Sequence, residues 1–132
     1  MLIVIRDEER VNKRFQDAEK HGIIICQGTI SCSSILKHLP LGPVIILTNA
    51  KLLSCDVCKY NKLTSEVQKM LRWPVTYQGH YIVLCGFDVE TQRVYYRNPT
   101  LTDRICVMPI RTLDDARKSY GTDEDTILIY NS

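Results

Sequence analysis

The sequence predicts a single domain that combines α-helices with β-strands. Its 132 residues suffice for one hydrophobic core and are too few for two ordinary domains. Short apolar runs of strand length alternate with stretches that carry apolar residues at helical spacing. The chain is 45% hydrophobic and 24% charged, which is the balance of a soluble globular protein and not of a disordered one. We therefore expect one domain over residues 1–132.

The first 27 residues predict a strand, a helix and a second short strand. Residues 1–5 are apolar, but the run is too short for a signal-peptide core or a membrane span, so a strand is expected. Residues 7–21 carry their apolar side chains on one helical face, and Gly22 favours the end of that helix. Residues 23–26 form another apolar run with a strand pattern.

The next segment predicts a capped helix followed by an interior strand. Ser31 offers an N-cap for a helix that ends before Pro40. Residues 44–48 form a continuous apolar run between turn residues, which predicts a central strand buried on both faces. Residues 51–76 show no clear pattern, and we expect an insertion loop there with a short helix over 66–72.

The second half of the chain predicts a β-hairpin. Strand patterns over residues 80–87 and 94–96 flank the turn-forming residues 88–92. Cys85 and Cys106 lie in apolar strand patterns, so both are expected to be buried.

A helix and a last strand are expected to close the chain. Thr112 and Asp115 resemble a capping box, which predicts a helix over residues 113–120 with Gly121 at its C-terminal end. Residues 126–130 have a strand pattern.

His80 and Asn98 form the clearest catalytic pattern. Gly79-His80 opens the first strand of the hairpin and Asn98-Pro99 follows its partner, so antiparallel pairing brings these ends together. A neutral imidazole can take a proton from a thiol, while an amide bonded to its other nitrogen fixes its tautomer. His80 is therefore predicted as a base and Asn98 as its orienting residue. The alternative is a structural histidine beside an ordinary turn.

Several long blocks of sequence resemble the guanylyl cyclase domain-containing protein family. They are Tyr77-Gln-Gly-His-Tyr-Ile-Val-Leu-Cys-Gly-Phe-Asp, Val94-Tyr-Tyr-Arg-Asn-Pro, Ala116-Arg-Lys-Ser-Tyr-Gly-Thr-Asp-Glu-Asp, Glu9-Arg-Val-Asn, Leu47-Thr-Asn and Cys55-Asp-Val-Cys. That family is similar in turn to the C39-like branch of papain-fold cysteine peptidases. The resemblance implies an α+β, papain-like fold with a mostly antiparallel sheet and flanking helices. It also places His80 and Asn98 in the positions of the catalytic base and its orienter.

The resemblance further implies a cysteine nucleophile that this chain lacks. In the family fold that cysteine starts a helix in an Asp-Cys-Gly-like segment, upstream of the first strand here. None of the six cysteines has this context. We therefore expect the C-terminal part of the fold, which is not a competent peptidase alone. The family name implies an alternative, a guanylate cyclase that converts GTP to cyclic GMP, and a non-catalytic protein-interaction module is a third.

Cys55 and Cys58 have the spacing of a zinc knuckle. They supply two ligands where a structural site needs four, so a zinc site and two metal-free thiols both stay open. No other cofactor is expected.

The charge pattern limits the classes of partner that we expect, and the cysteines indicate the cellular compartment. The net charge is +2 with both signs interspersed, which predicts neither a nucleic-acid nor a membrane partner. Reduced cysteines favour the cytoplasm or the nucleus. A partial papain-like fold would leave apolar surface uncovered, so self-association or an unknown protein partner is expected.

Overall fold

The computed structural model describes residues 13, 17, 20, 22–24, 26, 28–57, 67, 70–71 and 76–131. The strand expected over residues 1–5, most of the helix over 7–21, and Cys58 lie outside these residues. Residues 13 and 17 are helical, as are 67, 70 and 71 within the short helix expected over 66–72.

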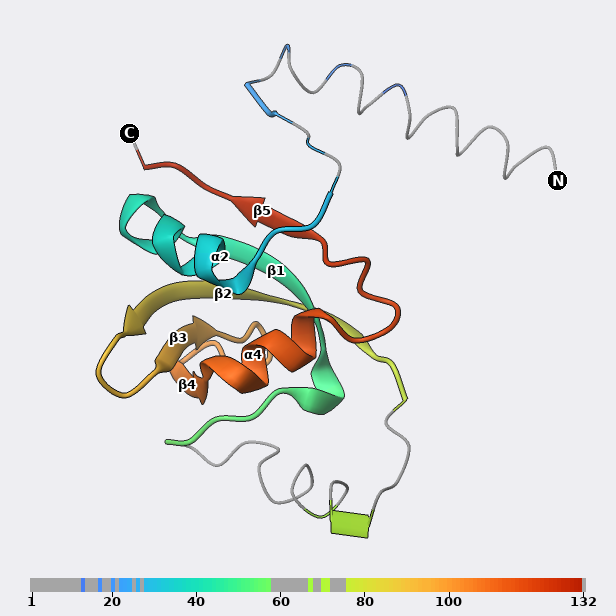
Figure 1. The fold of residues 1–132 in the computed structure, drawn as a ribbon, viewed down its shortest axis with the longest axis vertical. Helices are drawn as coiled ribbons and strands as arrows, with labels where there is room; N and C mark the ends of the chain where they lie inside the picture. The colour runs from blue at the N-terminus through green and yellow to red at the C-terminus, as the bar shows by residue number, and fades with distance from the viewer. Residues whose placement is uncertain are drawn as a thin grey trace, which may run out of the picture.

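A five-stranded antiparallel sheet in the order β4-β3-β2-β1-β5 forms the centre of the fold (Figure 1). The strands are β1 Val44–Asn49, β2 Gly79–Asp88, β3 Arg93–Arg97, β4 Cys106–Pro109 and β5 Thr126–Leu128. The predicted hairpin is confirmed, and the last strand, predicted over 126–130, begins as expected but ends at Leu128. The middle strand of the sheet is β2, and it carries His80. The candidate base therefore lies on a strand that is hydrogen-bonded to a neighbour on each side.

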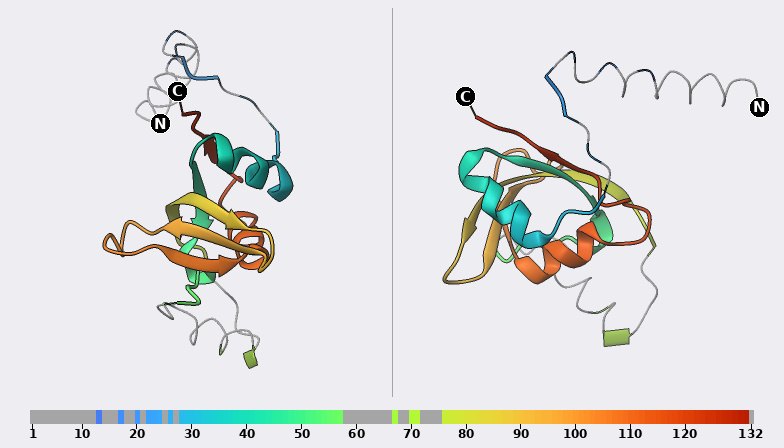
Figure 2. Two further views of the ribbon diagram at one scale, coloured as in Figure 1. Left: turned by 90° about the vertical axis from the view of Figure 1, so that its left-hand side faces the viewer. Right: turned by 45° about the horizontal axis from the view of Figure 1, so that its top comes forward.

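Within the continuously described ranges 28–57 and 76–131, two α-helices and two short 3₁₀ helices accompany the sheet. They are α2 Cys32–His38, η2 Leu39–Leu41, η3 Ala50–Leu52 and α4 Ile110–Arg117. The Ser31 hydroxyl accepts a hydrogen bond from the Ser34 N–H, which confirms Ser31 as the N-cap of α2. Both α-helices lie over the same face of the sheet (Figure 2). The described residues therefore form an α+β domain with a helical layer on one face of the sheet.

The hydrophobic core lies between that helical layer and the sheet. Alternate strand residues point into it, because successive side chains of a strand face opposite sides. Its fully buried members are Ile35, Val44, Ile46, Leu53, Cys55, Ile82, Leu84, Val94, Tyr96, Cys106, Met108, Leu113 and Ala116. Two of them, Leu53 and Cys55, show that the segment predicted as an insertion over 51–76 begins inside the core.

The structure corrects the strand predictions at three places. Strand β1 is interior but not buried on both faces, because Ile45 and Leu47 stay partly exposed on the side without helices. Cys85 is exposed because it lies at a register shift between β2 and β3, on the uncovered side. In the apolar run over 23–26, the described residues 23, 24 and 26 are exposed and form no strand.

The predicted bounds of the last helix are also wrong, because it ends at Arg117 with Lys118 as its C-cap and does not reach Gly121. Helix α4 begins at Ile110, directly after Pro109 of β4, and no side chain caps it. Proline fixes the backbone at this junction and lacks an N–H group that would need a partner, so the turn from strand to helix occurs without a cap. Thr112 therefore lies within the first turn and does not precede it.

No helix within the described ranges is long and apolar enough to cross a membrane.

Candidate functional site

The hairpin brings the two predicted site residues together. His80 lies opposite Thr48 of β1, on the face that the helices cover. Asn98 directly follows β3, whose last residue, Arg97, lies opposite Val83. The His80 Nε2 and Asn98 Oδ1 atoms are 2.8 Å apart, a hydrogen bond between two side chains. His80 is partly exposed, whereas Asn98 is buried.

Thr100 decides which ring nitrogen of His80 carries the proton. Its backbone N–H donates to Asn98 Oδ1 at 3.0 Å, and its hydroxyl donates to the same oxygen. A backbone N–H can only donate, so the Asn98 atom it faces must be the carbonyl oxygen. That oxygen also faces His80 Nε2, which must therefore be the protonated nitrogen. A neutral His80 then keeps the lone pair on Nδ1, where it can accept a proton.

Neighbouring polar residues fix the backbone at the start of β2. The Thr48 hydroxyl donates to the His80 carbonyl oxygen at 2.7 Å. The buried Asn49 accepts from the backbone N–H groups of Lys51 and Gln78, while its own amide nitrogen donates to the Ser119 hydroxyl at 3.0 Å. The strand that carries the candidate base is thus anchored to β1 and to the segment after α4.

Sequence reasoning missed Thr48, Asn49 and Thr100 as supports of the site. A signal for the first two was present, because a threonine and an asparagine follow an otherwise apolar strand run. No local pattern marks Thr100, because its role depends on the tertiary position of His80.

Gly79 gives space to an aromatic side chain. A Cβ atom at this position would lie 2.7 Å from the Tyr77 hydroxyl oxygen. The ring of Tyr77 also lies against Gly121, where a Cβ atom would come within 2.8 Å of it. At Gly79 the close contact of a Cβ atom would be with the hydroxyl end of Tyr77, whereas at Gly121 it would be with the ring itself.

No described cysteine is bonded to His80. Cys55 and Cys106 are buried in the core, and the Cys55 sulfur accepts from the Val107 N–H. The Cys85 thiol bonds the Tyr95 carbonyl oxygen on the other face of the sheet. Cys26, also described, is exposed.

The pKa values of two described thiols, Cys85 and Cys32, are raised, which disfavours the reactive thiolate. Although Cys85 reaches the surface, the atoms packed around its thiol partly desolvate it, which raises its pKa, and nearby Arg97 only partly offsets this. Burial also raises the pKa of Cys32, the Asp114 carboxylate adds to the effect, and Arg117 and Lys118 oppose it. The thiolate is the nucleophilic form, so neither environment activates its cysteine.

The zinc prediction at Cys55 and Cys58 stays a prediction, because Cys58 lies outside the described residues. Within the described ranges, no group of three or more His, Cys, Asp or Glu side chains is placed to hold a metal ion.

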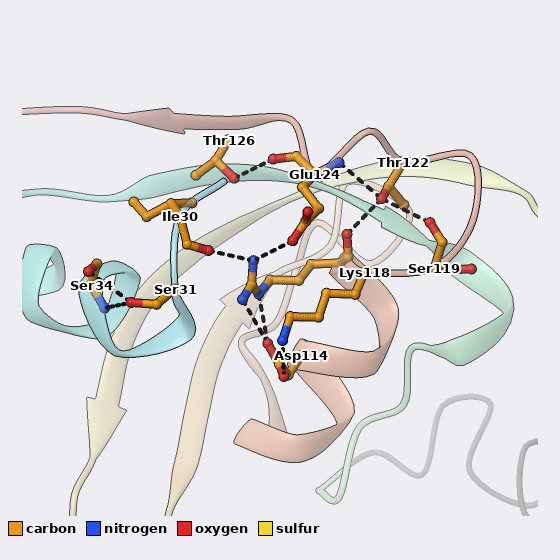
Figure 3. Close-up of polar contacts among 10 residues, drawn as sticks. Ile30, Ser31, Ser34, Asp114, Lys118, Ser119, Thr122, Glu124 and Thr126 are labelled. Carbon is orange, nitrogen blue, oxygen red and sulfur yellow. Dashed lines mark hydrogen bonds and ion pairs between the residues drawn. The ribbon is translucent and has the colours of Figure 1, made fainter. Parts of the chain in front are cut away.

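A second polar cluster forms around the buried Arg117, and it includes the partly exposed Asp114 and Glu124 (Figure 3). Its guanidinium bonds Asp114 at 2.8 Å and 2.9 Å, the Ile30 carbonyl oxygen at 3.0 Å and Glu124 at 3.4 Å. Lys118 adds a 3.0 Å ion pair to Asp114. The cluster joins the segment before α2 to the end of α4 and to the loop before β5.

Together, the fold and the first cluster define an α+β domain in which a buried amide is hydrogen-bonded to a histidine at the opening of the central hairpin. A family model described as guanylylate cyclase matches residues 2–129, and the chain belongs to that family. It is similar to Guanylyl cyclase 1 of Arabidopsis thaliana, with 32% identity over 126 residues, covering 93% of this chain and 44% of that protein. The chain thus spans less than half the length of this relative. No solved structure matches it.

Proposed function

We propose that His80 and Asn98 are the general base and the orienting amide of a thiol-dependent, papain-like catalytic centre. The observation that carries the proposal is the 2.8 Å bond from His80 Nε2 to an Asn98 oxygen whose orientation Thr100 fixes. This geometry leaves Nδ1 as the proton acceptor, which is what a nucleophilic thiol requires of its partner.

The chain would then supply the base half of an acyl-transfer site in a C39-like fold. The antiparallel sheet with a histidine at a strand opening supports this assignment. Since no described cysteine bonds His80, we propose that the chain alone is not a competent peptidase.

The first test follows the His80 ring by nitrogen NMR. We expect the Nε2-protonated neutral tautomer in the unmodified chain and a mixture of tautomers in Asn98→Ala. Asn131→Ala removes an exposed asparagine and is the matched control, with no expected effect on the His80 ring. If the His80 tautomer is the same in Asn98→Ala as in the unmodified chain, Asn98 does not orient the ring.

The second test supplies the thiol. A chimera joins the N-terminal part of the Arabidopsis relative to this chain and is treated with a peptidyl electrophile. Labelling of a cysteine in the added part should slow by about 10²- to 10⁴-fold in His80→Gln, the usual contribution of a general base. In the chain alone we expect no labelling that depends on His80. The chimera with His80 and the chimera with His80→Gln could be labelled at the same rate while NMR still shows the expected His80 tautomer. That result would refute the thiol chemistry but not the hydrogen bond between His80 and Asn98.

A second candidate rests on the printed name of the Arabidopsis relative, which describes a guanylyl cyclase. The chain would convert GTP to cyclic GMP and pyrophosphate with a divalent metal ion. Incubation of the chain with GTP and Mg²⁺ or Mn²⁺, followed by mass spectrometry, tests this directly. Cyclic GMP that disappears with a chelator would favour this candidate over the first.

A further inference from the structure

The first edge strand of the sheet, β4, has its outward backbone groups in use. The Val107 N–H donates to the Cys55 sulfur at 3.4 Å, and the Val107 carbonyl oxygen accepts from the Asp56 N–H at 2.8 Å. Pro109, which ends β4, has no N–H group to offer. A further strand would therefore find few free backbone groups at this edge.

The other edge strand, β5, is open. The N–H groups of Ile129 and Asn131 donate at 3.0 Å and 2.9 Å to carbonyl oxygens of the segment that leads into β1. Because backbone groups alternate between the two sides of a strand, those of Thr126, Leu128 and Tyr130 point away from β1. Within the described part of the chain, no hydrogen bond uses these groups, and we call them the open edge.

The sequence of β5 does not protect the open edge. Natural edge strands usually carry prolines, charged residues or bulges that keep other strands away. Residues 126–130 are Thr-Ile-Leu-Ile-Tyr, which are strand-forming residues without a charge or a proline. Ile127 is 53% exposed and Tyr130 is 68% exposed. The edge therefore has the composition of a strand that pairs on both sides.

The segment before α2 contains an apolar run without a partner. We call residues 22–26 the strap, of which Gly22, Ile23, Ile24 and Cys26 are described. Ile23 is 56% exposed and Ile24 is 82% exposed, although the run has a strand pattern. Gly22 and Gly28 flank the run with φ angles of +76° and +133°, in the region that glycine enters freely, so the chain can turn at both ends.

The strap is tethered beside the start of β5. The Ile30 carbonyl oxygen accepts from Arg117, which also pairs with Glu124, two residues before Thr126. Figures 1 and 2 show the segment before α2 passing this end of β5. The four residues from Cys26 to Ile30 can span up to about 14 Å, whereas neighbouring strands lie about 4.8 Å apart. The strap can therefore reach the open edge while Ile30 stays in place.

We propose that the strap docks on the open edge as a sixth, antiparallel strand and that the docked form predominates in solution. The direction follows from the tether, because the strap runs toward the start of β5. Docking satisfies outward backbone groups of β5 and buries the strap's two adjacent isoleucines, one on each face of the sheet. It also closes the edge against strands of other chains.

Amide hydrogen exchange in the full chain, followed by NMR, tests the docking. Adjacent residues of a strand point their N–H groups to opposite sides, so either Ile23→Pro or Ile24→Pro removes a bond to β5. In that variant the N–H groups of Leu128 and Tyr130 should exchange at least about tenfold faster than in the unmodified chain. Nuclear Overhauser contacts between the strap and β5 should disappear with them.

Two controls accompany this measurement. The Ile129 N–H bonds the Pro43 carbonyl oxygen and should exchange slowly in every variant, which reports that the sheet is intact. Val89→Pro places a proline at an exposed position of the hairpin turn and should leave exchange at Leu128 and Tyr130 unchanged.

Three results would overturn the proposal. Rapid exchange at Leu128 and Tyr130 in the unmodified chain means that the edge stays open. Slow exchange that survives both strap prolines and rises with protein concentration means that a second copy occupies the edge. Slow exchange that survives both prolines at every concentration means that a different segment of the chain does so.

Discussion

The two polar clusters, around His80 and Asn98 and around Arg117, differ in how completely their hydrogen-bonding groups are used. Every nitrogen of the buried Arg117 guanidinium has an acceptor. In the other cluster, the buried Asn98 Nδ2 has no hydrogen-bond partner among the described residues, and His80 keeps a free Nδ1. A satisfied cluster holds elements together, whereas an unsatisfied one costs stability and is typical of sites that bind or react. This difference is consistent with a structural role for the Arg117 cluster, and it supports our proposal that the His80–Asn98 pair is the reactive site.

The largest expected effect comes from breaking the structural cluster. Arg117→Met removes the buried cation from the partly exposed Asp114 and Glu124, together with its hydrogen bonds, and should cost about 1–3 kcal/mol of unfolding free energy. Lys118→Met removes the exposed cation beside it and should cost less than about 1 kcal/mol. Urea denaturation monitored by circular dichroism measures both. A loss below about 1 kcal/mol for Arg117→Met would show that the cluster does not hold these segments together.

The sequence predicted the His80–Asn98 pair but not the Arg117 cluster, for a physical reason. A hairpin is local, so its turn signal places the two strand ends side by side before any tertiary contact is known. The partners of Arg117 come from α4, from the loop before β5 and from Ile30, which is 87 residues away along the chain. Only the packed helical layer brings them together. The start of α4 was missed similarly, because a capping pattern was present while the strand-to-helix junction at Pro109 determined the boundary.

The next prediction sharpens the difference by charging the unsatisfied cluster. Asn98→Asp replaces the unpartnered amide nitrogen with a carboxylate oxygen, while the other oxygen keeps the bonds to His80 and Thr100. A carboxylate beside an imidazole favours its charged form, so the pKa of His80 should rise by about 1–3 pH units relative to the unmodified chain. NMR titration of the ring measures this, with Asn131→Asp as the control. An unchanged pKa would mean that the hydrogen bond is absent in solution.

The structural cluster should also make stability depend on pH. Burial alone would raise the pKa of Asp114, but the hydrogen bonds and charges of Lys118 and Arg117 outweigh it and hold the pKa below its usual value. A carboxyl with a lowered folded pKa contributes stability above the pKa of the unfolded chain, about 4. That contribution is lost as the pH falls through the folded pKa.

Urea midpoints between neutral and acidic pH test this dependence. Asp114→Asn should flatten the loss of stability below about pH 4. Asp115→Asn changes the exposed neighbouring carboxyl and should leave the curve as it is. Identical curves for the Asp114→Asn variant and the unmodified chain would place the acid sensitivity elsewhere.

The smallest effect is expected at the glycine beside the candidate base. In Gly79→Ala the new methyl group meets only the hydroxyl end of Tyr77, whose side chain is 41% exposed and free to move outward. The unfolding free energy should therefore change by less than about 1 kcal/mol. Gly121→Ala should cost more, because its φ of +106° disfavours any side chain and its Cβ would meet the Tyr77 ring itself. A larger loss of unfolding free energy for Gly79→Ala than for Gly121→Ala would show that the Tyr77 side chain cannot move away from the start of β2. The candidate site would then be more rigid than its partial exposure implies.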